Sequence, residues 1–178
     1  GFTFELNEYS DKTSIHSKAK FSSAAMAYAS NVEQLYYVSA PRPLEYALST
    51  DELNLTSSEL KSLPIKGTKF KYTRLAYVDV NSKTHTLLSR TSPMYRLAYN
   101  DQSGKLYGSY FTKLYEIDVF SGETTLLGEM TGYDKKSDMW LGDLAFKDNQ
   151  LYLISRNSIF SVDITNLSIK QLSKHNLT

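Results

Sequence analysis

One stretch, residues 95–130, sets the pattern for the rest of the chain. It reads YRLAYNDQSGKLYGSYFTKLYEIDVFSGETTLLGEM and predicts four short strands: RLAY, LYGSY, KLYEIDV and TTLLGEM. Alternating apolar residues predict strands with a buried face, and the pieces between them are rich in turn residues. The other parts of the chain repeat this stretch in part.

The second half of the stretch recurs without gaps. Residues 115–126 align with residues 76–87, and shorter matches fall at residues 160–168 and 4–13. The first half recurs as a Leu/Met-Ala-Tyr/Phe triplet that is followed by a Leu-Tyr pair. Three matching aspartates, at positions 79, 118 and 163, lie 39 and 45 residues apart. Self-similarity at such a period is typical of an array of supersecondary units.

An aspartate or asparagine follows one strand of every copy, just before the chain reverses. These residues are Asn7, Asp79, Asp118 and Asp163. The positions one and three residues earlier are apolar in every copy, which indicates one buried strand face. A short carboxylate or amide accepts hydrogen bonds from the N–H groups of a turn, so we expect four structural turn caps. Metal ligands are the alternative, but each residue lies in its own hairpin, so no metal site is predicted.

Four-stranded units of 39 to 47 residues fit the blades of a β-propeller. We predict an all-β fold of about three and a half antiparallel blades, in which residues 1–21 supply the half-blade. A β-sandwich is the rival, but it would not predict the same turn chemistry in register along the chain. Residues 1–178 would form a single domain, as an open arc or an excerpt of a longer propeller. Uncovered blade edges would promote self-association.

One segment, residues 41–69, interrupts the first complete blade. Three prolines punctuate it, and two Ser/Thr-x-x-Glu capping boxes begin at Ser49 and Thr56. One or two short helices are therefore expected between residues 50 and 63. The insertion would serve as a lid over one blade edge or as a docking element for a partner.

The pattern LAY…LYG…LYEIDVFSGETTLLG resembles the repeats of bacterial extracytoplasmic β-propeller proteins of the YncE/DUF4394-like type. The resemblance covers about three quarters of the chain, and the insertion departs from it. It implies a bacterial protein that is periplasmic, secreted or on the cell surface. It also implies a binding or scaffold module, because most such propellers are modules of that kind. The repeats carry no functional motif, and the fold hosts many unrelated functions.

Composition and missing motifs exclude several kinds of function. The net charge is +1 with acidic and basic residues interspersed, so we expect no nucleic-acid partner. No apolar run approaches the roughly 18 residues of a membrane span, so we expect no direct membrane insertion. The chain has no cysteine, no P-loop and no G-x-S-x-G, and its three histidines lack zinc-site spacing. We therefore expect no cofactor and assign no catalytic residue.

The best-motivated ligand site lies where the chain leads into each blade and where it joins the second strand to the third. In a propeller these connections surround one mouth of the central channel. Rings and charged groups there suit a sugar or a peptide, which stacks on the rings and is oriented by polar groups. The alternative is that Trp140 and the neighbouring methionines pack between blades while the charges are solvated. The candidates are Arg96, Asp143, Trp140, Tyr95, Arg42, Lys113 and Arg156.

Two functions stay open. The first is a non-catalytic recognition or scaffold module for a protein or glycan ligand, within a larger bacterial surface or periplasmic protein. The second is a glycan hydrolase or lyase whose carboxylates, Asp143 among them, converge on the channel. The absence of a compact catalytic motif favours the recognition module.

Overall fold

The computed structural model describes residues 2–7, 12–40, 42–43, 58, 71–134, 139 and 142–174, and it describes the backbone alone for residues 2–7, 12–16, 42–43 and 71–72. The first half contains β1 (Phe2–Asn7), β2 (Lys12–Lys18), β3 (Ala25–Ala29), the 3-10 helix η1 (Ser30–Val32), β4 (Gln34–Val38), β5 (Arg42–Pro43), β6 (Lys71–Asp79) and β7 (His85–Thr91). The second half contains β8 (Arg96–Asn100), β9 (Lys105–Tyr110), β10 (Lys113–Ile117), β11 (Thr124–Glu129), β12 (Asp143–Lys147), β13 (Gln150–Ile154), β14 (Ser158–Val162) and β15 (Ile169–Lys174). No helix in this described part is long and apolar enough to cross a membrane.

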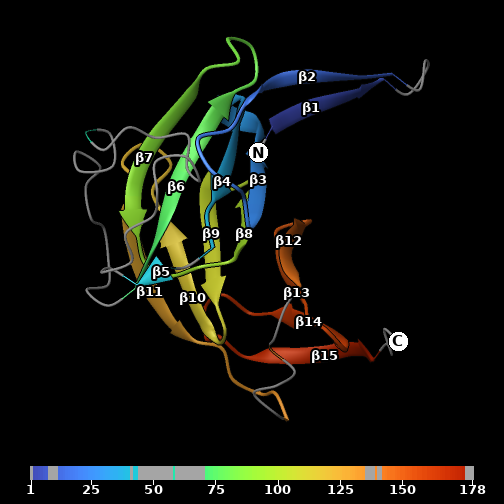
Figure 1. The fold of residues 1–178 in the computed structure, drawn as a ribbon. Coiled ribbons are helices and arrows are strands. Elements are labelled where there is room, and N and C mark those ends of the chain that lie inside the picture. Colours follow the sequence, from blue (N-terminus) through green and yellow to red (C-terminus); the bar gives the residue numbers. More distant parts are fainter. Residues whose placement is uncertain are drawn as a thin grey trace.

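Three antiparallel sheets form the body of the molecule, and each is a blade (Figure 1). Blade 1 has the strand order β3-β4-β6-β7 with β5 attached to β6, blade 2 has β8-β9-β10-β11, and blade 3 has β12-β13-β14-β15. The first strands lie side by side, with β3 next to β8 and β8 next to β12. This radial arrangement confirms the predicted all-β, propeller-like array of four-stranded antiparallel blades.

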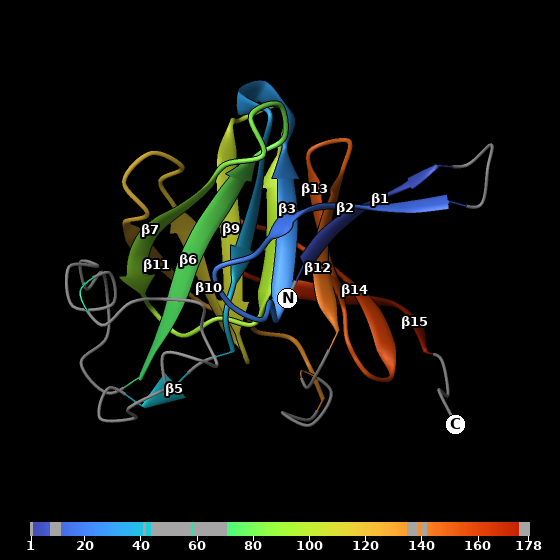
Figure 2. The ribbon, with the colours of Figure 1, turned by 45° about the horizontal axis from the view of Figure 1, so that its top comes forward.

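The N-terminal hairpin of β1 and β2 is a separate two-stranded sheet that projects away from the blades (Figure 2). The chain that follows it is anchored on blade 1, because Phe21 packs against Tyr37 and Ala76. The ring of His85 adds polar contacts. Its Nε2 lies 2.6 Å from Oγ of Ser17, and its Nδ1 lies 2.8 Å from the hydroxyl of Tyr37.

The hydrophobic core lies between the blades. Because side chains alternate along a strand, Leu97 and Leu106 of blade 2 pack against blade 1, while Ala98 and Leu114 pack against blade 3. All five residues of β8 are buried as a result. Apolar residues at both parities of one strand therefore mark a sheet that is covered on both faces.

The third and fourth strands of each blade are joined by the same turn. In blade 2, Oδ1 of Asp118 accepts hydrogen bonds from the N–H groups of Phe120 and Ser121, at 3.1 and 2.6 Å. The carboxylate of Asp79 accepts from the N–H groups two and three residues later, and that of Asp163 from the N–H group two residues later. Each aspartate thus closes a local turn at the same end of its own blade.

The predictions for the 41–69 insertion and for Asn7 fall largely on residues that the structure does not describe. The insertion at residues 41–69 is described only at Arg42–Pro43 and Ser58. Arg42–Pro43 form β5, which pairs with Tyr72 and Lys71 at the start of β6. The helices expected between residues 50 and 63 and the side chain of Asn7 lie outside the described residues.

Candidate functional site

Each blade has two ends that carry different connections. The link end holds the chain that leads into each first strand and the connection between the second and third strands. The turn end holds the other two hairpin turns. The sequence placed ligand candidates at the link end, where Arg96 begins β8, Lys113 begins β10 and Asp143 begins β12.

Arg96 is fully buried at this end and holds three segments together. Its Nη1 lies 3.2 Å from Oγ of Ser109 and 3.1 Å from the carbonyl oxygen of Phe111, and its Nη2 donates to the carbonyl oxygen of Met139. The guanidinium lies 4.7 Å from the centroid of the Tyr95 ring. Burial lowers the pKa of Arg96, although Tyr95 and Asp143 oppose the shift. These contacts tie blade 2 to the link into blade 3.

Asp143 lies close to Arg96 and is exposed. Its carboxylate accepts a hydrogen bond from the N–H group of Leu144 at 2.8 Å. Although the residue as a whole is exposed, neighbouring strands restrict the hydration of the carboxyl group. This loss of hydration raises the pKa of Asp143, against the opposing effects of the backbone N–H groups of Leu144 and Leu97 and of the Arg96 charge.

Tyr95 completes a small group with Arg96 and Asp143. It is half-buried, its ring meets those of Tyr110 and Phe111 edge to face, and its hydroxyl accepts from the N–H group of Phe111 at 3.0 Å. The methionines of the links, at positions 94 and 139, are fully buried. The structure therefore brings three of the predicted residues together. Many of their hydrogen-bonding groups, however, are already bonded to other parts of the protein.

The remaining candidates are not part of this group. Lys113 and Arg156 are exposed at the link ends of blades 2 and 3. Trp140 and the side chain of Arg42 lie outside the described residues.

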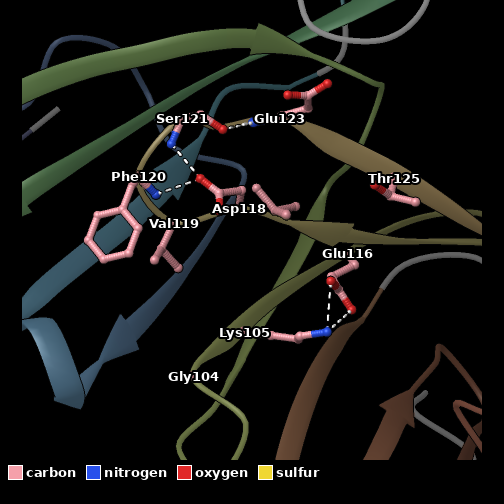
Figure 3. Close-up of a pocket in the computed structure, with 10 residues that line it drawn as sticks. Gly104, Lys105, Glu116, Asp118, Val119, Phe120, Ser121, Glu123 and Thr125 are labelled. Carbon is pink, nitrogen blue, oxygen red and sulfur yellow. Dashed lines mark hydrogen bonds and ion pairs between the residues drawn. The ribbon is translucent and has the colours of Figure 1, made fainter.

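A pocket of about 400 Å³ opens at the opposite, turn end of blade 2 (Figure 3). It lies beside the turns that join β8 to β9 and β10 to β11, and its volume falls within the range of roughly 300–1,000 Å³ that is usual for small-ligand sites. Its lining includes Gly104, Lys105, Glu116, Asp118, Phe120 and Glu123.

The charged groups of the lining are mostly acidic. Nζ of Lys105 lies 3.0 Å from both carboxylate oxygens of Glu116. Asp118 accepts the N–H groups of its turn, which lower the pKa of its carboxyl group and keep it ionised at neutral pH. Glu123 is exposed, and its carboxylate has no hydrogen bond or ion pair with the described residues.

Phe120 is the most exposed large apolar side chain in the described part of the chain, at 77%. In Figure 3 its ring lies on one side of the turn, the Lys105–Glu116 pair lies on the other, and Asp118 lies between them. A ring that is not buried in any blade interface is free to stack on a ligand.

Comparison with blade 1 explains why blade 2 has this opening. The hairpin registers make Gly104 equivalent to Glu33 and Phe120 equivalent to Asn81. In blade 1, Nδ2 of Asn81 lies 2.6 Å from Oε2 of Glu33, so the two turns are bridged. Glycine and phenylalanine cannot form that bridge, and the space between the turns of blade 2 stays open.

Sequence reasoning did not identify this pocket. The available indication was Phe120, an aromatic residue at a turn position where the other two complete blades hold Asn81 and Thr165 and the first copy holds Tyr9. Its exposure and its distance from the predicted site emerge only from the fold. Among the described residues, no group of three His, Asp or Glu side chains is placed to hold a metal ion.

No protein-family model and no curated protein sequence matches the chain. Solved structures that share its fold include two nutrient binding proteins. An auxiliary nutrient binding protein from Bacteroides ovatus ATCC 8483 superposes with a TM-score of 0.62 at 12% identity, over 99% of this chain and 38% of that one. An auxiliary nutrient binding protein from Bacteroides thetaiotaomicron VPI-5482 gives a TM-score of 0.60 at 11% identity, again over 99% and 38%. The chain thus spans well under half the length of these proteins.

Proposed function

We propose that this chain is a non-catalytic recognition module that binds a protein or glycan ligand through the turn-end pocket of blade 2. The observation that carries the proposal is the exposed Phe120 ring beside charged groups that line a pocket of ligand size. Phe120 and Glu123 contribute nothing visible to the contacts between blades, so their arrangement is available for a ligand. The shared fold of two proteins described as nutrient binding supports the same reading.

The proposal includes the setting of the module. We infer that residues 1–178 form one partial propeller domain of a larger bacterial extracytoplasmic protein, of the YncE/DUF4394-like type that its repeats resemble. The 41–69 insertion would be a lid or docking element, and uncovered blade edges would allow self-association. Support comes from the repeats and from the 38% coverage of the two Bacteroides proteins.

The test is a binding screen in which the reaction products are also analysed. Glycan and peptide arrays would be probed with the wild-type chain, with Phe120→Ala at the turn end and with Arg156→Ala at the link end. We expect binding without product formation, loss of binding in Phe120→Ala and no change in Arg156→Ala. Binding that survives Phe120→Ala but not Arg156→Ala would move the site to the link end.

A glycan-active hydrolase or lyase is the second candidate, and one observation favours it. The raised pKa of Asp143 is the property that a general acid needs, and the residue lies at the start of the first strand of blade 3. In that case the link-end residues, with Tyr95, Lys113 and Arg156, would form the site. Turnover that is abolished by Asp143→Asn but not by Asp118→Asn would establish catalysis and overturn the recognition proposal.

A further inference from the structure

We propose that the turn-end pocket of blade 2 binds one basic side chain, a lysine or an arginine of an extended peptide. This inference rests on the recognition function proposed above and narrows it to one class of ligand. It follows from the charge of the lining, from the place of the Phe120 ring and from the size of the opening.

The charge of the lining selects a cation. Lys105 and Glu116 neutralise one another through their 3.0 Å ion pair, which leaves the carboxylates of Asp118 and Glu123 in excess. The carboxylate of Asp118 accepts hydrogen bonds from the N–H groups of Phe120 and Ser121 and from the Ser121 side chain, and these neutral donors leave its negative charge unbalanced. An ammonium or guanidinium group between these carboxylates gains charge-assisted hydrogen bonds.

The Phe120 ring is an apolar surface for the stem of a lysine or arginine side chain. Lysine and arginine have long apolar stems, which lie along apolar surfaces while the charged head stays among polar groups. In Figure 3 the Phe120 ring lies beside the Asp118 carboxylate, so an apolar stem on the ring would place its charged head near the acidic groups. A guanidinium group would also gain from stacking on the ring face.

The size of the opening limits what enters. A pocket of about 400 Å³ accepts one side chain and its adjoining backbone, but it does not accept a folded surface. A neutral sugar would also stack on Phe120 and bond to carboxylates, but it would gain nothing from the excess negative charge. The charge of the lining therefore favours the basic peptide, and the experiment tests a neutral sugar as the competing ligand.

The experiment compares two peptides that differ only in charge. The 178-residue chain is titrated with acetyl-Gly-Gly-Arg-Gly-Gly-amide and with the same peptide carrying citrulline, whose side chain has the shape of arginine without its charge. Maltotetraose serves as the neutral sugar probe. We expect the citrulline peptide to bind at least about tenfold more weakly, which corresponds to about 1.4 kcal/mol. Added salt should weaken only the arginine peptide.

Two variants locate the site. The double variant Gly104→Glu/Phe120→Asn transfers the Glu33–Asn81 bridge of blade 1 to blade 2. There is space for glutamate, because a Cβ at position 104 would meet only atoms 3.8 Å away, and the left-handed strain at φ 68° is of the kind that Glu33 already bears at φ 52°. We expect this variant to fold and to lose the arginine peptide. Glu123→Gln should weaken the peptide about threefold or more, whereas Glu129→Gln, an equal charge change at the link end of β11, should not.

The outcomes separate this inference from the proposed function. Equal binding of the arginine and citrulline peptides, or no binding of the arginine peptide up to millimolar concentration, overturns the inference. If maltotetraose binds and the Gly104→Glu/Phe120→Asn double variant, here called the closed variant, loses it, the pocket is a recognition site for sugars and only the ligand class is wrong. If the closed variant is folded and still binds the arginine peptide, the pocket is not the site and both proposals fail.

Discussion

The hydroxyl of Tyr36 lies 2.8 Å from the carbonyl oxygen of Val119, across the boundary between blades 1 and 2. Tyr36 belongs to β4 and is fully buried, while Val119 belongs to the turn after β10. The same hydroxyl lies 2.6 Å from Oε1 of Gln34. Since it has one proton to donate, both contacts are satisfied only when the Gln34 amide is turned to present its NH₂ group. Burial raises the pKa of Tyr36 far above that of a free tyrosine.

Replacing Tyr36 with phenylalanine should weaken the contact between blades 1 and 2. The ring would be kept, but the buried carbonyl of Val119 would lose its partner, so we expect the free energy of unfolding to fall by about 2 kcal/mol. Urea unfolding measures the change. Tyr152→Phe is the matched control, because this residue is also on the second strand of its blade, is half-buried, and makes no hydrogen bond through its hydroxyl to the described residues. Equal stability of the two variants would show that the contact contributes nothing.

Replacing Arg96 with methionine tests whether this residue serves the fold or a ligand. The variant would leave the carbonyl oxygens of Phe111 and Met139 without their donor, so we expect a loss of about 3 kcal/mol in the free energy of unfolding. Arg156→Met, at an exposed site, should change it by less than about 0.5 kcal/mol. A stable Arg96→Met protein that has lost ligand binding would contradict the structural role and return Arg96 to the ligand site.

The fifth residue of the repeated turn has a left-handed backbone in blades 1 and 2, so we expect both positions to tolerate glycine better than a residue with a side chain. Gly122 has φ 67°, and a Cβ there would lie 2.4 Å from Oγ of Ser89, so Gly122→Ala should cost more than about 1 kcal/mol. Lys83 holds the equivalent place at φ 59°, and its side chain is exposed. Lys83→Gly should be neutral or stabilise by up to about 1 kcal/mol, because relief of left-handed strain offsets the added chain entropy. Thermal unfolding of both variants checks the pair, and a clear loss in Lys83→Gly would refute the strain argument.

Acid should destabilise the turns through Asp79, Asp118 and Asp163. Backbone hydrogen bonds lower the pKa of Asp79 and Asp118 in the folded state below the ordinary value of 3.8, and a side-chain hydrogen bond from Thr165 is the main cause of the same shift for Asp163. A lowered folded-state pKa contributes stability that is present above the unfolded-state value and is lost as the pH falls through the folded-state value. We therefore expect stability to decline below about pH 4.

The variant Asp118→Asn isolates one of these groups. At pH 7 we expect it to lose about 1 kcal/mol of unfolding free energy, because an amide is a weaker acceptor than a carboxylate. The gap to the wild type should narrow as the pH falls below about 4, where the wild-type carboxyl group takes up its proton. Denaturant unfolding at a series of pH values measures this gap. A gap of the same size at every pH would mean that the charge of Asp118 does not matter.

The strands were predictable because their causes are local. Alternation in KLYEIDV and RLAY reports which residues face a neighbouring sheet, and β10 and β8 begin at the predicted residues, Lys113 and Arg96. Asp118 meets N–H groups only two and three residues later, so the residue type at a reversal was enough to suggest the cap. The 3-10 turn η1 was missed, because Glu33 takes a left-handed conformation at φ 52° without a glycine to announce it.

The candidate site was less predictable because it depends on distant contacts. Arg96 looked like an exposed ligand residue, yet its partners Ser109 and Met139 lie 13 and 43 positions away, and together they bury it. From its residue type alone, Phe120 would be expected in the hydrophobic core. It is exposed because its turn lies at the rim of blade 2 and because Gly104, from another hairpin, offers it no partner.

By itself the amino-acid order determined the number of repeats, the strand positions and the chemistry of the turns, since each depends on neighbours within a few residues. The tertiary structure alone decided which charged groups are sealed between blades and which surround an opening. The physical reason is that hydration of a side chain depends on every segment packed around it, and those segments come from all three blades.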